Sequence, residues 1–250
     1  MVVEVQQRTD VAHVVTAAGA DHLSIDPQDA MEEYLRDQLP GPLAELLASS
    51  RAFGYLAAAT PGMRELLTAG KIWELAQDER RTPGADPYDL VVVDAPATGH
   101  GVAVLAAPRT FADAAHVGPI ARQGATIADM LSDPSRTAVV VVTAPEEMPV
   151  NETLALTEAV REEIGSPPAL VVVNGLLRDR LREEEAARLA AARDHPAVRA
   201  ALVAHARARE QRAQLRRLRR HVGVPTVTLP FHPGEPDLPA LTRRLAEAVR

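Results

Sequence analysis

The sequence of 250 residues contains no cysteine and only one lysine, Lys71. The absence of cysteine excludes disulfides and thiolate metal sites. Aromatic residues make up only 3% of the chain, whereas hydrophobic residues make up 46%. The core must therefore consist mainly of Val, Leu, Ala and Ile, a composition that suits a parallel β-sheet covered by helices.

Long apolar segments are also missing. No apolar run approaches the roughly 18 residues that span a bilayer, and no charged leader with an apolar core precedes Val2. We therefore expect a cytoplasmic protein without a transmembrane segment. The net charge of −7 argues against a general role in binding polyanions. A chain of this length can bury a sizeable core, so we expect a single domain over residues 1–250.

Apolar runs rich in β-branched residues predict buried strands. These runs cover Val2 to Val5, Leu90 to Val93, Ala138 to Val142, Leu170 to Val173 and Thr226 to Leu229. Helical patterns separate them. Asp26 followed by Pro27 is typical of a helix start, and Asn151 stands before a second helical pattern in the same way. The alternation predicts an α/β fold with a mostly parallel sheet flanked by helices.

The strand predicted at Leu90 to Val93 runs into Asp94 and then into a turn rich in Pro and Gly. Ligands of open parallel sheets bind at the carboxyl ends of the strands. A carboxylate there can hold the water shell of Mg²⁺, while the backbone N–H groups of Thr98, Gly99 and His100 face a terminal phosphate. The alternative interpretation is a surface turn that follows a buried strand.

The whole string Asp94-Ala-Pro-Ala-Thr-Gly-His100 resembles the switch II segment of the ArsA-type ATPases, which include arsenite-pump and tail-anchored-protein-targeting ATPases. Further segments that resemble the family follow in the family's order: Ser24 to Ala30, Pro61 to Glu65, Pro145 to Glu147 and Val171 to Asn174. The resemblance implies a phosphate-loop NTPase-like fold that uses ATP and Mg²⁺. It also implies a dimer in which the segments around Asp94 and Glu147 lie close to the partner.

The resemblance also implies a site for adenine. Asn174 resembles the family's adenine-reading asparagine, whose amide can both donate and accept hydrogen bonds. The residues Pro230, Phe231 and His232 follow the last predicted strand and resemble the loop that lies against the base. The alternative for these residues is a polar strand end and a turn. The histidines show no metal-ligand spacing, so Asp94 is the only metal-site candidate, through water.

Two features of the family pattern are missing from these residues. In the family, the Gly-Lys-Ser/Thr phosphate loop should precede Met1 together with the first strand and the first helix. Gly70-Lys71-Ile72 cannot replace this loop, because Glu65 stands where Gly is needed and Ile72 where Ser or Thr is needed. We therefore expect Lys71 to be an exposed helical lysine. The arsenite-pump metalloid site also lacks its cysteines.

The start of the sequence departs from the family in a second way. Val2 to Val5 resembles the strand after which the family places a catalytic Asp, and the best-matching position is Gln6. An amide can orient a water molecule but cannot accept its proton. Glu4 is a nearby carboxylate that strand alternation is expected to point elsewhere.

Two helical segments carry alternative interpretations. Residues 101–136 correspond to a short helical insert after switch II, where core packing of one or two amphipathic helices competes with an apolar groove for a client protein of unknown identity. Residues 196–220 combine arginines with an apolar face, and predict an amphipathic helix whose basic side is a solvated or partner-binding face. Nucleic-acid binding through this helix is the less favoured alternative, because no aromatic residue lies among the arginines.

Two hypotheses for function remain. The first is an ArsA-type ATPase, a dimeric switch in which Asp94 holds the Mg²⁺ shell, Thr98, Gly99 and His100 sense the γ-phosphate, and Asn174 with the Phe231 loop binds adenine. The second is a non-catalytic partner subunit of an active paralogous ATPase. The expected assembly is a homodimer or a heterodimer with a paralogous ATPase.

Overall fold

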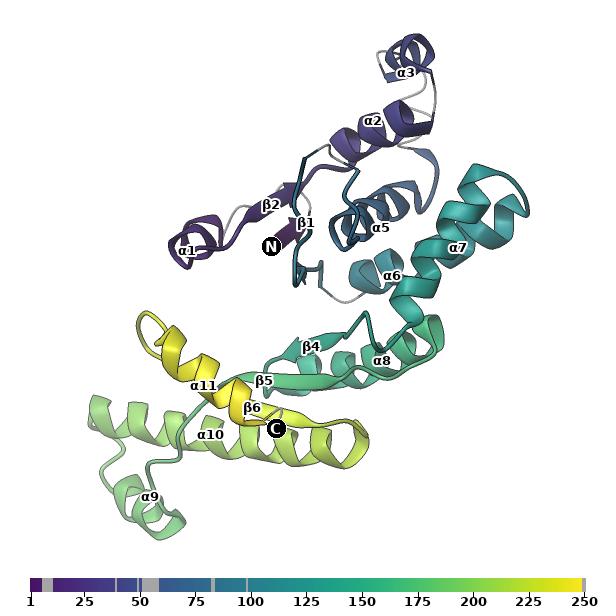
Figure 1. Ribbon diagram of the computed structural model, residues 1–250. Coiled ribbons are helices and arrows are strands. Elements are labelled where there is room, and N and C mark those ends of the chain that lie inside the picture. The colour runs from purple at the N-terminus through teal and green to yellow at the C-terminus, as the bar shows by residue number, and fades with distance from the viewer. Residues whose placement is uncertain are drawn as a thin grey trace. The chain divides into compact units, whose positions relative to one another are not determined.

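The computed structural model (Figure 1) describes residues 1–5, 11–38, 40–48, 50, 59–81, 84–97 and 99–248. The chain forms two compact units, which are described separately: Met1–Thr137 with Glu163–Gly165, and Ala138–Glu162 with Ser166–Arg250. Both contain parallel strands flanked by helices, so the predicted α/β class is confirmed. The strands form two three-stranded sheets. Among the described residues, no helix has both the length and the apolar character that a membrane span requires.

The sheet of the first unit has the strand order β2-β1-β3, with every pair parallel. The strands are β1 Val2–Val5, β2 His22–Ile25 and β3 Val92–Asp94. The described helices of this unit are α1 Ala12–Ala17, α2 Pro27–Gln38, α3 Gly41–Ala48, α5 Met63–Leu75, α6 Gly99–Ala115 and α7 Pro119–Ser132. Its core cluster consists of Val3, Ile25, Ala30 and Leu75.

The first turn of α2 begins as its sequence predicts. Pro27 is the first helical residue, and the backbone N–H of Gln28 donates a 2.8 Å hydrogen bond to Oδ1 of Asp26. This bond satisfies one of the amides that a helix leaves without an internal partner. Strand β2, immediately before it, was not predicted, because His22 and Ser24 interrupt its apolar pattern.

Helices α6 and α7 occupy the segment expected to be a short insert. They approach closely at Gly124, where an added Cβ would lie 2.6 Å from the carbonyl oxygen of Pro108. Ile127 and Met130 are buried, whereas Ile120 is exposed. Glycine is therefore required at this crossing by the distance between backbones.

The sheet of the second unit has the order β4-β5-β6, again parallel throughout. The strands are β4 Val140–Thr143, β5 Leu170–Leu176 and β6 Thr226–Pro230. The described helices of this unit are α8 Glu147–Ile164, whose last two residues belong to the first unit, α9 Glu183–Ala190, α10 Pro196–His221 and α11 Leu238–Ala248.

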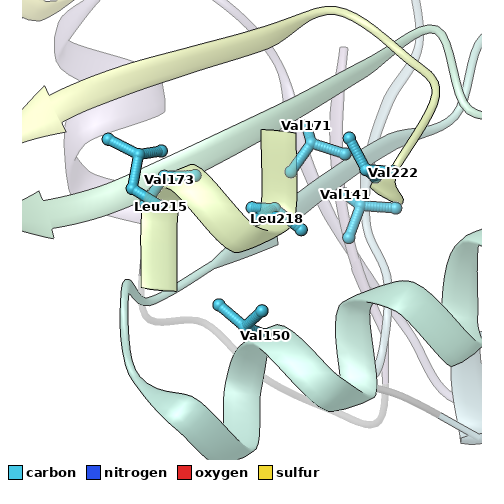
Figure 2. Packing of buried hydrophobic residues seen from close by; sticks show 7 residues of the cluster. All are labelled: Val141, Val150, Val171, Val173, Leu215, Leu218 and Val222. Atoms are coloured by element: carbon cyan, nitrogen blue, oxygen red, sulfur yellow. The ribbon is translucent and has the colours of Figure 1, made fainter. Parts of the chain in front are cut away.

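Both faces of this second sheet carry apolar side chains. On one face, side chains from β4, β5, α8 and the end of α10 point toward one another (Figure 2); they are Val141, Val150, Val171, Val173, Leu215, Leu218 and Val222. On the other face, Leu241 and Leu245 of α11 pack on a cluster formed by β5 and β6. Residues buried on both faces explain why β5 reads as a continuous apolar run.

Several strand and helix boundaries differ from those predicted from the sequence. Strand β3 begins at Val92 instead of Leu90, and β5 continues past Val173 to Leu176. Asn151 does not start a helix, because α8 already begins at Glu147. The earlier start is hidden in the sequence because Pro149 lies in the first turn, where proline is tolerated without an N–H.

Candidate functional site

Asp94 is the last residue of β3 and is exposed at the carboxyl end of that strand. Helix α6 starts at Gly99, so Gly99 and His100 are its first residues, and both are exposed. Thr98, the other predicted phosphate contact, lies outside the described residues. The first amides of a helix have no partner within it, and the helix dipole favours a negative charge there. Asp94 thus ends a parallel strand five residues before the exposed start of α6.

The turn between Asp94 and α6 depends on a glycine that the sequence analysis did not single out. A Cβ added at Gly101 would lie 2.6 Å from the carbonyl oxygen of Pro96. Real Cβ contacts of this length essentially never occur, so a side chain here would displace the backbone after Asp94. The glycine permits the sharp return from strand to helix.

Glu4 is a second polar feature of this sheet. It is fully buried in β1, and the parallel register places it beside Ser24 on one neighbour and Asp94 on the other. Its Oε2 lies 2.7 Å from Nε2 of His22 and accepts a 3.3 Å hydrogen bond from the N–H of Val11. The carboxylate is thus directed to β2 and to the start of α1. Only the apolar context of a glutamate in Val-Val-Glu-Val could have signalled this burial.

Gln6, the residue that best matches the position of the family's catalytic Asp, lies outside the described residues. Among the residues that the structure does describe, no group of three or more His, Cys, Asp or Glu side chains could hold a metal ion. Mg²⁺ does not require such a cage, because it commonly keeps several waters and binds through one or two carboxylates and the phosphates of a substrate. Asp94 fits that mode of binding.

The adenine candidates lie in the second unit, where β5 meets β6. Val173 pairs with Thr228 and Leu176 pairs with Pro230, so Asn174 and Gly175 stand opposite the single residue Leu229. Gly175 has a φ of +76°, in the left-handed region that favours glycine. This irregularity is a β-bulge, a feature that redirects side chains next to functional sites. Asn174 is exposed at this bulge, two residues before the end of β5.

The predicted loop after β6 lies directly beside the bulge. The N–H of Phe231 donates a 3.0 Å hydrogen bond to the carbonyl of Leu176, and the Phe231 residue is 54% exposed. Pro230 ends the strand, and Nε2 of His232 is buried without a hydrogen-bond partner among the described residues. The structure therefore brings together Asn174 and this loop, with an exposed aromatic ring and an unsatisfied ring nitrogen. In this set the exposed Phe231 ring can stack on a planar heterocycle and the exposed Asn174 amide can hydrogen-bond to it, whereas the buried His232 nitrogen cannot reach a ligand.

Helix α10 confirms the amphipathic helix predicted at residues 196–220. Several of its arginines are already paired within the second unit. Arg207 lies 2.6 Å from a carboxylate oxygen of Glu146, and Arg209 is paired with Glu183. Paired guanidinium groups have less charge to offer to phosphates, which weakens the nucleic-acid alternative.

The buried side of α10 contacts the segment that follows β5. Gln211 is 4% exposed, and its Oε1 accepts a 2.9 Å hydrogen bond from the N–H of Leu177. Asp179 lies 3.1 Å from Nδ1 of His205 and 3.5 Å from Arg212. Sequence analysis missed these contacts because glutamine in an arginine-rich helix resembles a solvated residue.

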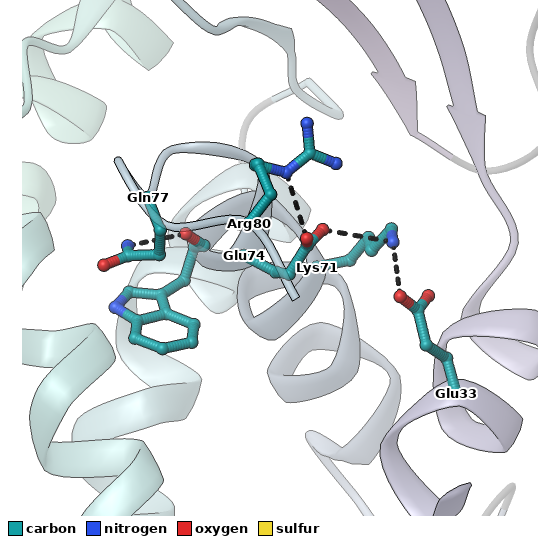
Figure 3. A network of polar contacts seen from close by, with 6 residues as sticks. Glu33, Lys71, Glu74, Gln77 and Arg80 are labelled. Carbon is teal, nitrogen blue, oxygen red and sulfur yellow. Dashed lines mark hydrogen bonds and ion pairs between the residues drawn. The ribbon is translucent and has the colours of Figure 1, made fainter. Parts of the chain in front are cut away.

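The structure contradicts the expectation for Lys71. It was expected to be an exposed helical lysine, but its side chain is only 18% exposed. In Figure 3 its ammonium group lies between Glu33, at 2.7 Å, and Glu74, at 3.2 Å. Arg80 donates from Nε to the other oxygen of Glu74 at 3.0 Å. The lysine connects α2 and α5, so it is structural and its placement inside α5 excludes a phosphate loop there.

This network lowers the pKa of the Glu74 carboxyl group. Burial raises its pKa, but the hydrogen bond from Arg80 and the charge of Lys71 lower it by more. The net pKa is below the ordinary value, so Glu74 is an anion at neutral pH.

Comparisons with known proteins support the family resemblance found in the sequence. The anion-transporting ATPase family model matches residues 114–199. The ATPase BagA of Mycobacterium tuberculosis is 31% identical over 203 residues, which cover 79% of this chain and 58% of BagA. The arsenical pump-driving ATPase of Escherichia coli is 29% identical over 184 residues, which cover 66% of this chain and 30% of that protein. The corresponding protein of Acidiphilium multivorum is 28% identical over 193 residues, covering 69% of this chain and 31% of that protein.

The chain thus spans little more than half the length of its mycobacterial relative, with 58% of BagA covered. The matched family and the names of these relatives agree with the resemblance carried by the Asp94 and Asn174 segments. The chain belongs to the ArsA-type family of anion-transporting ATPases.

Proposed function

We propose that this chain supplies the Mg²⁺-binding, γ-phosphate-sensing and adenine-binding parts of a cytoplasmic, nucleotide-driven ArsA-type switch. The observation that carries the proposal is the placement of Asp94 at the carboxyl end of a parallel strand, five residues before the start of α6. Ligands of parallel α/β sheets bind at this end of the strands. Gly101, in the first turn of α6, allows the close approach of this helix to the carbonyl of Pro96, two residues after Asp94.

In this proposal each group of residues has one role. Asp94 holds the water shell of Mg²⁺, and the amides of Thr98, Gly99 and His100 contact the terminal phosphate. Bound Mg²⁺ supplies charge neutralisation for phosphoryl transfer to water. The Asn174 amide reads the edge of adenine, while Pro230, Phe231 and His232 form the surface against which the base lies.

The 250 residues contain no Gly-Lys-Ser/Thr loop, and that loop and its lysine normally neutralise and orient the β- and γ-phosphates. Hydrolysis therefore requires a phosphate-binding segment that is not among these residues. The same observation favours a second candidate function, a non-catalytic subunit paired with an active paralogous ATPase. Upstream codons in frame with Met1 distinguish the two: a Gly-Lys-Ser/Thr loop supports the first, and an immediate stop codon supports the second.

Calorimetry with adenosine, ADP and MgATP tests the adenine and metal roles on the 250-residue chain. We expect weak binding of all three ligands, because base contacts are present while the polyphosphate lacks its cradle. Asn174→Ala should weaken the binding of each ligand by about tenfold, because it removes the hydrogen bonds of one uncharged amide to the base. Asn151→Ala, which changes the chain's other asparagine on α8, serves as the matched control.

An assay of ATP hydrolysis can contradict the proposal. The purified chain should release no phosphate from ATP above background, since transition-state electrostatics dominate this reaction. Measurable turnover that Asp94→Ala abolishes would mean that the phosphate site has been misplaced. Sub-micromolar MgATP binding by the same chain would have the same meaning, and unchanged adenosine binding in Asn174→Ala would remove the base site from the proposal.

A further inference from the structure

Gln211 is the only uncharged amide side chain that α10 buries in the described part of the chain, at 4% exposure. Its Oε1 accepts the 2.9 Å hydrogen bond from the N–H of Leu177, a residue 34 positions away in sequence. A buried polar side chain is costly unless it is hydrogen-bonded. The contact therefore gives a reason for glutamine at this position that the amphipathic pattern alone does not.

The amide of Leu177 needs this acceptor because the β-ladder ends just before it. Leu176 is the last residue of β5, and its partner on β6 is Pro230. The carbonyl of Leu176 is taken by the N–H of Phe231, the first residue after β6. Gln211 thus continues the hydrogen bonding of β5 by one residue beyond the sheet.

Two more side chains of α10 contact the same segment. His205 lies 3.1 Å and Arg212 lies 3.5 Å from the carboxylate of Asp179. The segment from Leu177 to Asp179 is therefore bound to α10 through one backbone amide and one carboxylate. It starts three residues after Asn174, and only Gly175 and Leu176 separate the two.

We propose that Gln211 is a positioning residue for base recognition: by binding the Leu177 amide it fixes the bulge at Asn174 and Gly175, and so the direction of the Asn174 amide. This inference rests on the proposed function, in which Asn174 reads adenine. A bulge residue is unpaired by its nature, and Gly175 at φ +76° adds no side chain that could hold it. The bulge is held on its β6 side by the Phe231 hydrogen bond and on its α10 side by Gln211.

The test measures adenosine and inosine binding by calorimetry for the whole chain and four variants. Gln211→Leu removes the acceptor, and Gln211→Asn withdraws it by one methylene group. Gln211→Glu keeps an oxygen at the same distance. Gln214→Leu removes an amide from the same helix three residues later and is the matched control.

We expect Gln211→Leu and Gln211→Asn each to weaken adenosine binding by about tenfold and to reduce the preference for adenosine over inosine. Gln211→Glu should retain most of both, and Gln214→Leu should behave as the unaltered chain. Amide hydrogen exchange should show faster exchange at Leu177 in the first two variants only.

The outcomes separate the inference from the function on which it rests. If the unaltered chain binds neither nucleoside, the adenine site fails and the positioning role fails with it. If the unaltered chain prefers adenosine and both Gln211→Leu and Gln211→Asn keep that preference, the positioning role alone is overturned. Weaker binding of both nucleosides with an unchanged ratio would indicate a purely structural glutamine, and would also overturn it.

Discussion

Replacement of Glu74 by glutamine should destabilise the first unit more than any exposed charge substitution in it. Glu74 is 3% exposed, and the side chain of Arg80, which donates to it at 3.0 Å, is 7% exposed. Lys71 contacts the other carboxylate oxygen at 3.2 Å. Glutamine keeps the shape of the side chain but leaves two cations without their shared anion (Figure 3).

The magnitude follows from this burial. Removing one partner of a buried ion pair costs about 3–5 kcal/mol, because the remaining charge is desolvated without compensation. Since glutamine can still accept one hydrogen bond, we expect Glu74→Gln to cost about 3 kcal/mol, at the lower end of that range. The exposed pair of Glu32 and Arg36 in α2 provides the control, and Glu32→Gln should cost no more than about 0.5 kcal/mol.

Urea unfolding followed by tryptophan fluorescence measures these differences in the first unit. Trp73 is the only tryptophan of the chain and lies in α5 next to Glu74. Its signal therefore reports the unit that contains the network. A Glu74→Gln variant that unfolds at the same urea concentration as Glu32→Gln would refute the assignment of stability to this network.

The pH dependence gives an independent measurement. The folded-state pKa of Glu74 is lowered, so its stabilising contribution is fully present above the unfolded value of about 4.3 and disappears as the pH falls through the folded-state pKa. The difference between the unaltered chain and Glu74→Gln should thus be constant from neutral pH down to about pH 5 and should shrink below about pH 4. A difference that stays constant to the lowest pH at which the chain folds would contradict this reasoning.

Two further substitutions test the packing within each unit separately. Leu218 is fully buried in the cluster of Figure 2, and Leu218→Ala should lower the free energy of unfolding of the second unit by about 2–5 kcal/mol. Urea titrations followed by circular dichroism measure this loss, and a loss below about 1 kcal/mol would contradict the packing described. Gly124→Ala should destabilise the first unit by about 1–3 kcal/mol, because the added Cβ would lie 2.6 Å from the carbonyl oxygen of Pro108. Urea unfolding followed by Trp73 fluorescence measures this change. Helix propensity alone predicts a stabilised variant, and that result would show that α6 and α7 do not approach there.

Sequence patterns predicted five of the six described strands because each contains a run of β-branched residues. The expected burial was wrong for β3, where Val92 is 49% exposed and Asp94 is also exposed. Strand β2 was missed for the opposite reason: His22 and Ser24 alternate with Leu23 and Ile25, and a run of four residues with two polar members does not stand out. The histidine in that strand is explained by Glu4, which lies 2.7 Å away on β1. A pair formed across two strands has no signature in either strand alone.

The candidate site shows the same division between local and distant information. Asp94 could be placed at a strand end from the sequence, because it follows its own apolar run directly. Asn174 also follows an apolar run, but β5 continues two residues beyond it to Leu176. The bulge at Gly175 could not, because it depends on the register between β5 and β6. Gln211 could not be assigned either, since its partner is 34 residues away and its own surroundings are mostly charged.

Lys71 shows how a residue type can mislead when it is rare. As the only lysine it invites comparison with a phosphate-loop lysine, and the sequence around it then suggests an exposed helical residue instead. Neither description holds, because Glu33 from α2 and Glu74 from α5 surround its ammonium group. The apolar pattern of α5 gives the helix, but one of the two carboxylates that contact the lysine comes from another helix, α2.

The residues proposed for chemistry and those that stabilise the fold are physically distinct in this chain. Asp94, His100 and Asn174 are exposed, whereas Glu74 and Leu218 are buried. Substitutions of exposed residues away from packed contacts usually change stability by less than about 0.5 kcal/mol. A binding defect in Asp94→Asn or Asn174→Ala that comes with an unchanged unfolding curve is therefore a direct measure of lost ligand contacts. Gln211 is the exception, because it is buried and acts through Leu177, and only the ratio of adenosine to inosine affinity separates its positioning role from its packing.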